Sequence, residues 1–219
     1  MAYGFFLLAG FPYGDFLEHQ AGNVLPWPVE MSVRLRPFGL IGEATLYPPM
    51  LPPLPVKELR LTPAPWGYAL EGHLLGGHVR GRGSSREMVL AFKDVEVGAW
   101  LPSVQGPLSG EMRLDRQGVR FALLFRGKVA LEGMPLRFQS VAVKGRWQER
   151  GELTLLLEKG DLQGRMDLHL SPTGSLKGEG TIQATAQAPP MVRALFPGRE
   201  ALAVGGSLAA PRLVPVDAP

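Results

Sequence analysis

Residues Leu108 to Arg126, LSGEMRLDRQGVRFALLFR, contain the clearest indication of the fold in this sequence. Apolar and polar residues alternate over 108–115, and over 119–126 every second residue is a large apolar one. Arg116-Gln117-Gly118 lies between the two runs. A period of two is that of a β-strand, because successive side chains point to opposite faces of a sheet. The stretch therefore predicts an antiparallel hairpin with one apolar face, formed on its second strand by Val119, Phe121, Leu123 and Phe125.

The same pattern recurs on both sides of this hairpin. Residues 30–36, 57–62, 68–75, 77–83 and 87–93 precede it, and 162–170 and 176–186 follow it. Strands at intervals of about ten residues, separated by Gly-bearing turns, are typical of an antiparallel meander. In the run 162–170 the apolar positions are Leu162, Met166, Leu168 and Leu170.

A glycine recurs early in several of these strands, at Gly110, Gly164 and Gly178. Glycine inside a strand often marks a bend or a close approach. If these glycines occupied the same place in successive hairpins, they would curl the sheet along one line. We therefore expect an all-β fold: a single curved, mostly antiparallel meander sheet that forms a half-pipe or an open barrel.

Short helices are expected near both termini. Residues 13–21 have helical spacing, with Asp15 placed to cap them. Residues 190–204 also show helical spacing, broken at Pro197-Gly198, and 205–215 is expected to form one last strand. Residues 13–219 are expected to be a single β-rich domain.

The apolar segment 1–12 precedes this domain. Ala2–Phe11 is uncharged, but it is about half as long as the ~20 residues that a spanning helix needs. Two interpretations stay open, a buried strand or helix and the remnant of a membrane anchor. Membrane association through this segment is therefore an open possibility.

Composition narrows the function classes. The chain has no cysteine and a formal net charge of +3, and its basic residues are spread along the sequence. It thus has no thiolate metal site, no thiol nucleophile and no sequence footprint of nucleic-acid binding. The compartment is not decided by cysteine content.

No catalytic constellation is visible, so we expect no enzyme, no cofactor and no metal site. The sequence contains no Gly-x-Ser-x-Gly elbow. His73 and His78 are five residues apart in a strand region, which predicts that they lie on opposite faces. Arg80, Arg82 and Arg86 are expected to face solvent, where an anionic lipid headgroup or an acidic partner could contact them.

The order of features resembles the type II secretion system protein N family, within the wider AsmA-like group of envelope proteins. The matching pieces are Phe11-Pro12-Tyr13 after an apolar run, LEGHLLGGHVRG at 70–81, VEVGAWLPSVQGPLSG at 95–110 and GGSLAAPRLVP at 205–215. The resemblance implies a β-rich domain on the periplasmic side of the inner membrane, with a single-pass anchor. The segment 1–12 departs from that pattern because it is too short and has no basic flank.

Two functions are therefore expected. The first is a non-enzymatic cell-envelope component that scaffolds or contacts subunits of a secretion or type IV pilus-like machine. The alternative is a lipid-binding or lipid-transfer module whose curved sheet forms a groove. The residues expected to line that groove are Val119, Phe121, Leu123, Phe125, Leu162, Met166, Leu168 and Leu170.

Overall fold

The computed structural model describes residues 28–37, 39–47, 52–65, 67–84, 86–101, 103–131, 134–207 and 211–216. The expected helix at 13–21 and the apolar segment 1–12 lie outside these ranges. The described part contains one 15-stranded sheet with a short 3₁₀-helix and a short α-helix. The elements are β1 (Val29–Arg36), β2 (Gly39–Leu46), β3 (Leu54–Ala64), β4 (Gly67–Leu74), β5 (Gly77–Gly83), β6 (Glu87–Glu96), η1 (Val97–Ala99), β7 (Val104–Gln105), β8 (Pro107–Asp115), β9 (Gly118–Leu131), β10 (Met134–Trp147), β11 (Gly151–Gly160), β12 (Leu162–Leu170), β13 (Leu176–Ala184), α3 (Pro190–Leu195), β14 (Glu200–Gly206) and β15 (Pro211–Pro215).

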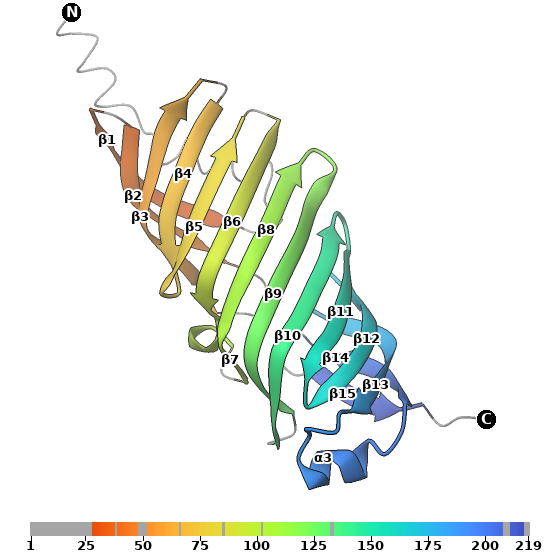
Figure 1. Cartoon of the computed structure of the whole chain (residues 1–219). Helices are drawn as coiled ribbons and strands as arrows, with labels where there is room; N and C mark the ends of the chain where they lie inside the picture. Colours follow the sequence, from red (N-terminus) through yellow and green to blue (C-terminus); the bar gives the residue numbers. More distant parts are fainter. Residues whose placement is uncertain are drawn as a thin grey trace, which may run out of the picture.

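The strands lie in the sheet in the order in which they occur in the chain (Figure 1). Neighbouring strands of the described residues pair antiparallel throughout. The exception to the order is β7, which pairs with residues 128–129 of β9, next to the part of β9 that pairs with β8. The expected all-β antiparallel meander is therefore confirmed. Short turns suffice for it because each strand returns directly beside the one before.

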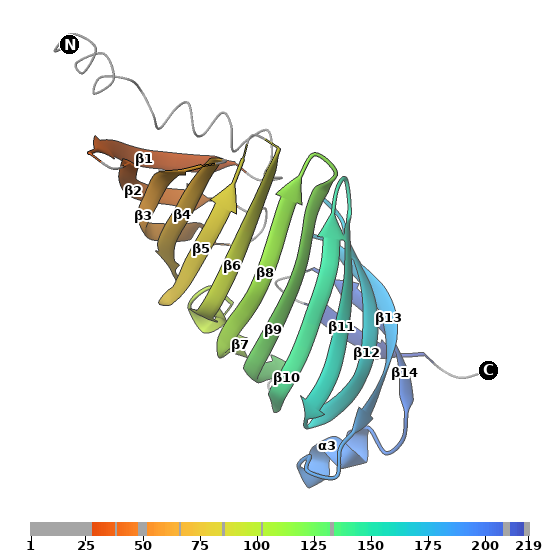
Figure 2. The same ribbon diagram turned by 45° about the horizontal axis from the view of Figure 1, so that its top comes forward.

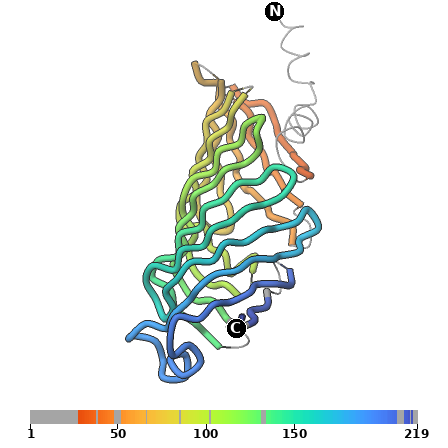
Figure 3. The backbone as a smooth tube through the Cα atoms, turned by 90° about the vertical axis from the view of Figure 1, so that its right-hand side faces the viewer, coloured from red at the N-terminus to blue at the C-terminus, as the bar shows by residue number. Residues whose placement is uncertain are grey.

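The sheet is curved and open. The middle strands form one wall, and the first and last strands bend to the same side of it (Figure 3). Register shifts in β3, β6 and β10 mark bulges, and Glu58 and Asp94 at two of them have φ of 51° and 54°. A bulge bends its strand and increases the local twist, so these irregularities contribute to the curl.

One face of the sheet, which we call the inner face, is apolar from end to end. Paired residues on adjacent strands point to the same face, so the registers define rows of side chains across the sheet. One such row crosses fourteen strands without a polar residue. It consists of Leu35, Leu40, Leu61, Leu70, Gly81, Leu90, Met112, Phe121, Gly145, Leu153, Leu168, Gly178, Val204 and Leu213.

The recurrent glycines do not lie along one line. Gly110, Gly164 and Gly178 fall in three different rows, opposite Leu123, Leu157 and Leu168. The expectation of a single glycine bend line was therefore wrong. The spacing of the glycines in the sequence could not predict which row each one occupies, because strand lengths and bulges change the register from one hairpin to the next.

The C-terminal region contains one short α-helix and two strands. The helix α3 ends at Leu195, and β14 and β15 follow where the sequence suggested a longer helical pattern and a single last strand. Pairing with β13 holds residues 200–204 extended, so sheet contacts outweigh local helical spacing. The α3 helix lies at the end of the curl beside β12–β14 (Figures 1 and 2).

Candidate functional site

The eight residues that the sequence selected for a groove all lie on the inner face. Four come from β9 and four from β12, and β10 and β11 lie between the two strands. The registers connect Phe121 to Leu168 through Gly145 and Leu153. The alternation in the sequence thus located the face correctly, even for strands that do not touch.

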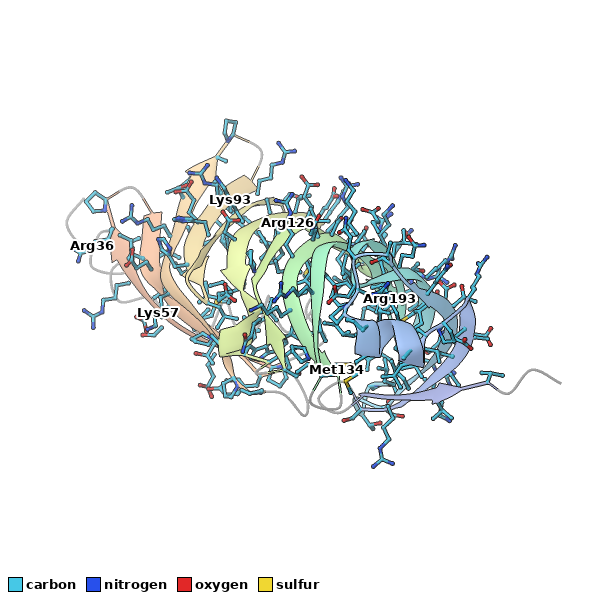
Figure 4. All side chains as sticks on the ribbon, turned by 60° about the horizontal axis from the view of Figure 1, so that its bottom comes forward. Arg36, Lys57, Lys93, Arg126, Met134 and Arg193 are labelled. Atoms are coloured by element: carbon cyan, nitrogen blue, oxygen red, sulfur yellow. The ribbon has the colours of Figure 1, made fainter. Side chains whose placement is uncertain are left out.

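These eight residues nevertheless differ in their surroundings. Phe125, Leu162, Met166 and Leu168 belong to a buried cluster that also contains Val192 of α3, which is 1% exposed. A single-layer sheet can bury side chains this fully only by curling over them, and α3 closes the end. Met134, labelled in Figure 4 with Arg193 of α3, packs against the same cluster. This end of the inner face is therefore a packed core. Val119 on β9 is also buried, at 6% exposed.

The middle of the inner face is more accessible. Leu70, Leu90, Met112, Phe121 and Leu123 are each partly exposed on β4, β6, β8 and β9. The buried cluster in the N-terminal half contains only Leu74, Val79 and Val95. Leu70 and Leu90 pack partly against this cluster, and Leu114 on β8 is 0% exposed. The inner face from β4 to β9 therefore carries partly exposed apolar side chains between buried ones.

Sequence reasoning did not single out Leu70 and Leu90 as lining residues. The signal was present in 87–93, where Met88, Leu90 and Phe92 alternate with Val89, Ala91 and Lys93. It was weak because Val89 and Ala91 on the other face are also apolar. Only the pairing of Leu90 with Met112 and Gly81 places it on the inner face.

Glycines on the inner face are covered by larger neighbours. A β-carbon added at Gly83 would meet the Tyr68 ring, and one added at Gly81 would meet Leu90 Cδ2 at 2.6 Å. Burial raises the pKa of the Tyr68 phenol above its ordinary value. Side chains from neighbouring strands therefore fill the space above these glycines.

The opposite face, the outer face, carries charge. Its ion pairs include Arg113 Nε–Glu87 Oε1 at 2.9 Å and Arg165 Nε–Asp167 Oδ2 at 3.0 Å. Hydrogen bonds from Arg165 and then Thr154 hold the pKa of Asp167 below its usual range. These side chains are exposed, so each pair adds little to stability and the face is mainly a solvated surface.

The predicted anionic-partner residues lie on or beside this outer face. Arg80 and Arg82 are exposed on β5, and Arg86 is exposed in the turn before β6. Arg80 Nε is 3.4 Å from Glu71 Oε1 on the neighbouring strand, which reduces its availability to another anion.

The prediction for the two histidines was wrong. His73 and His78 pair across the β4–β5 hairpin, with ring centroids 4.5 Å apart. The alternation of faces holds only within one strand. Because the turn at 75–76 separates the two histidines into different strands, their spacing of five residues does not place them on opposite faces. Within the described ranges, no group of three or more His, Asp or Glu side chains is placed to hold a metal ion.

Three further observations bear on function. Among the described residues no helix is long and apolar enough to cross a membrane. In the same residues every buried side-chain nitrogen or oxygen has a hydrogen-bond partner. No family model, curated protein or solved structure matches this chain.

Proposed function

We propose that this protein is a lipid-binding or lipid-transfer module, in which the partly exposed middle of the inner face receives an acyl chain. The observation that carries the proposal is the unbroken apolar row, of which Leu70, Leu90, Met112 and Phe121 are partly exposed. Contiguous apolar side chains that keep contact with water are candidates for a binding surface. A location in the cell envelope is part of the same proposal.

The dimensions support an acyl chain as the ligand. Four strand spacings separate β4 from β9, which is ~19 Å at ~4.8 Å per spacing. The hydrocarbon of one membrane leaflet is ~15 Å deep, half of the ~30 Å bilayer core. Because Gly81 is covered by Leu90, the surface between these strands stays smooth enough for an extended chain to lie across them.

The proposal is tested by native mass spectrometry of protein purified from bacterial cells under mild conditions, and by titration with a fluorescent fatty acid. Wild-type protein should carry lipid and bind the probe. The double variant Leu90→Gln/Phe121→Gln should lose both, because it places two amides on the apolar row.

The matched control is Ala91→Gln/Ala122→Gln. These alanines are the next residues along β6 and β9, exposed on the outer face. The control should keep the lipid and the probe affinity, and thermal unfolding must show that both double variants remain folded. A wild-type protein that is free of lipid and does not bind the probe contradicts the proposed function.

A second candidate, contact with subunits of a secretion or pilus-like machine, is favoured by one feature of the outer face. Leu124, Ala142 and Leu156 are paired across β9, β10 and β11 and form a short, partly exposed apolar strip within the charged surface. Leu124→Asp/Leu156→Asp should abolish the recovery of such subunits from envelope extracts while lipid binding is retained. Failure of wild-type protein to recover any secretion or pilus subunit contradicts this candidate.

A further inference from the structure

Turns on one edge of the sheet bring together arginines that are far apart in the sequence. The β1–β2, β3–β4, β5–β6, β8–β9, β10–β11 and β12–β13 turns lie along the same edge of the sheet, because strands that are neighbours in its order run antiparallel. The β3–β4, β5–β6, β8–β9 and β10–β11 turns form the upper edge in Figure 1. We call this edge the hairpin rim. Four of its hairpins carry an exposed arginine at the turn, namely Arg36, Arg86, Arg116 and Arg150.

The charge of these four arginines is not cancelled locally. Three carboxylates of the rim are already paired with arginines of the strands: Glu87 with Arg113, Asp115 with Arg120, and Glu152 with Arg146. Within the described residues, none of the four turn guanidinium groups forms an ion pair with a carboxylate. Glu149 is the remaining acidic side chain at the four turns.

The opposite rim has no such excess. Its described connections contain Asp161, Arg193 and Arg199, and the adjoining strand ends carry Lys93, Lys128 and Lys159 together with Asp94, Glu96 and Glu200, so cations and carboxylates are close to balance there. Figure 4 marks Arg36 from the hairpin rim, and Lys57, Lys93 and Met134 from strand ends toward the other. The fold thus creates a charge difference between its two long edges, although the chain as a whole has a net charge of only +3.

The arrangement indicates an extended anionic surface as the partner. Successive hairpins on one rim are two strands apart, about 10 Å, so the turn arginines form a line and do not converge on one small anion. A polar hollow of about 540 Å³ lies between the β8–β9 and β10–β11 turns. Its charged lining residues are Arg116, Arg146 and Arg150 with Asp115, Glu149 and Glu152, and of these carboxylates Asp115 and Glu152 are already paired with arginines. That hollow offers room for a headgroup within the line.

Aromatic residues border this rim on the inner face. Tyr68 and Trp147 lie in the row of side chains closest to the hairpins, at Tyr68–Gly83–Met88 and Leu114–Val119–Trp147. Tyr and Trp favour the boundary between hydrocarbon and water, where a ring is half apolar and half hydrated. A basic rim with aromatic residues beneath it matches a lipid headgroup layer better than it matches a nucleic acid or an acidic protein.

We infer that the hairpin rim docks on an anionic membrane surface, with Arg36, Arg86, Arg116 and Arg150 contacting lipid headgroups. This surface is separate from the inner face. If the proposed lipid-binding function holds, docking by the hairpin rim means that a lipid reaches the apolar row from that edge of the sheet. Basic residues near an anionic leaflet strengthen binding additively, and salt weakens the attraction.

The test is co-sedimentation of the full chain with vesicles of phosphatidylcholine, with and without phosphatidylglycerol. Wild-type protein should bind the anionic vesicles and dissociate as salt is raised. The variant Arg36→Gln/Arg86→Gln/Arg116→Gln/Arg150→Gln should bind them roughly 600-fold more weakly at low salt, since each of the four basic residues near the surface contributes about fivefold.

The control removes the same number of charges elsewhere: Lys93→Gln/Lys128→Gln/Lys159→Gln/Arg193→Gln. These four side chains are exposed and lie away from the hairpin turns, so affinity for anionic vesicles should change by less than about twofold. Equal losses in the two variants overturn the inference, because net charge alone would explain them. Unchanged binding by the folded rim variant, or equal binding of wild-type protein to neutral vesicles, also overturns it.

The two proposals can fail separately. The rim variant should still bind the fluorescent fatty acid in solution, and Leu90→Gln/Phe121→Gln should still sediment with anionic vesicles. Loss of vesicle binding in the inner-face variant alone would assign membrane contact to the apolar row and contradict docking by the rim.

Discussion

The ring of Phe121 on β9 lies over Gly145 on β10. The two residues are paired, and a β-carbon added at Gly145 would come within 2.7 Å of Phe121 Cζ and 2.5 Å of the Glu152 carbonyl oxygen. Glycine at this position therefore lets the aromatic ring lie flat on the inner face. The same relationship recurs at Gly178, where Leu168 Cδ2 would be 2.8 Å from an added β-carbon.

Gly145→Ala should destabilise the fold by about 1–3 kcal/mol, because the new methyl group must displace both the ring and a strand carbonyl. Denaturant unfolding measures the change. Gly205→Ala on β14 is the control, since an added β-carbon there meets no atom within 4 Å, and it should change stability by less than about 0.5 kcal/mol. Equal effects of the two substitutions would contradict this account of Gly145.

Ile182→Ala should cost about 2–5 kcal/mol, because Ile182 is 1% exposed within the C-terminal cluster and its removal leaves a cavity. Val214→Ala on the outermost strand, where Val214 is 56% exposed, should cost less than about 0.5 kcal/mol. The comparison uses the free energy of unfolding in urea. A small effect at Ile182 would mean that this end of the sheet is loosely packed.

Asp161 accepts a hydrogen bond from the Arg137 backbone N–H, at 2.8 Å from Oδ2, and is 7% exposed. Asp161→Ala should destabilise the protein by about 1–3 kcal/mol, because the N–H loses its acceptor away from water. Asp161→Asn keeps a carbonyl oxygen and should recover a large part of that loss. If the two variants unfold at the same denaturant concentration, the hydrogen bond is not the cause.

Asp115 gives the hairpin rim a pH dependence. The Gln117 backbone N–H and then the Arg120 guanidinium hold the pKa of Asp115 below its ordinary value. Since the folded-state pKa is the lower one, the stabilisation is present above the ordinary pKa of an aspartate and is lost as pH falls through the folded-state pKa. Asp115→Asn should therefore lower the melting temperature at neutral pH and have little effect in strong acid. A difference that stays constant with pH would contradict this.

Much of the fold follows from local alternation. Residues 108–115 and 119–126 contain enough period-two pattern to place Met112 and Phe121 on the same apolar face, and the structure pairs them directly. The pattern failed at the histidines, where parity was counted across the hairpin turn at 75–76. It also failed at 200–204, whose extended conformation depends on pairing with β13.

The candidate site was predictable only in part. Alternation identified the inner face, but it could not separate Phe121, which is partly exposed, from Phe125, which is 5% exposed four residues later on the same strand. That difference depends on how the sheet curls and on α3 closing its end. Both are properties of strands that are distant in the sequence.

The strand period, the turns and the apolar face could be inferred from the amino-acid sequence, because these depend on neighbours one or two residues apart. The tertiary structure was needed to distinguish the buried from the partly exposed residues of that face, since burial depends on the curl. It also decided that Arg36, Arg86, Arg116 and Arg150, scattered along the chain, share one rim, because a serial antiparallel sheet returns alternate turns to the same edge.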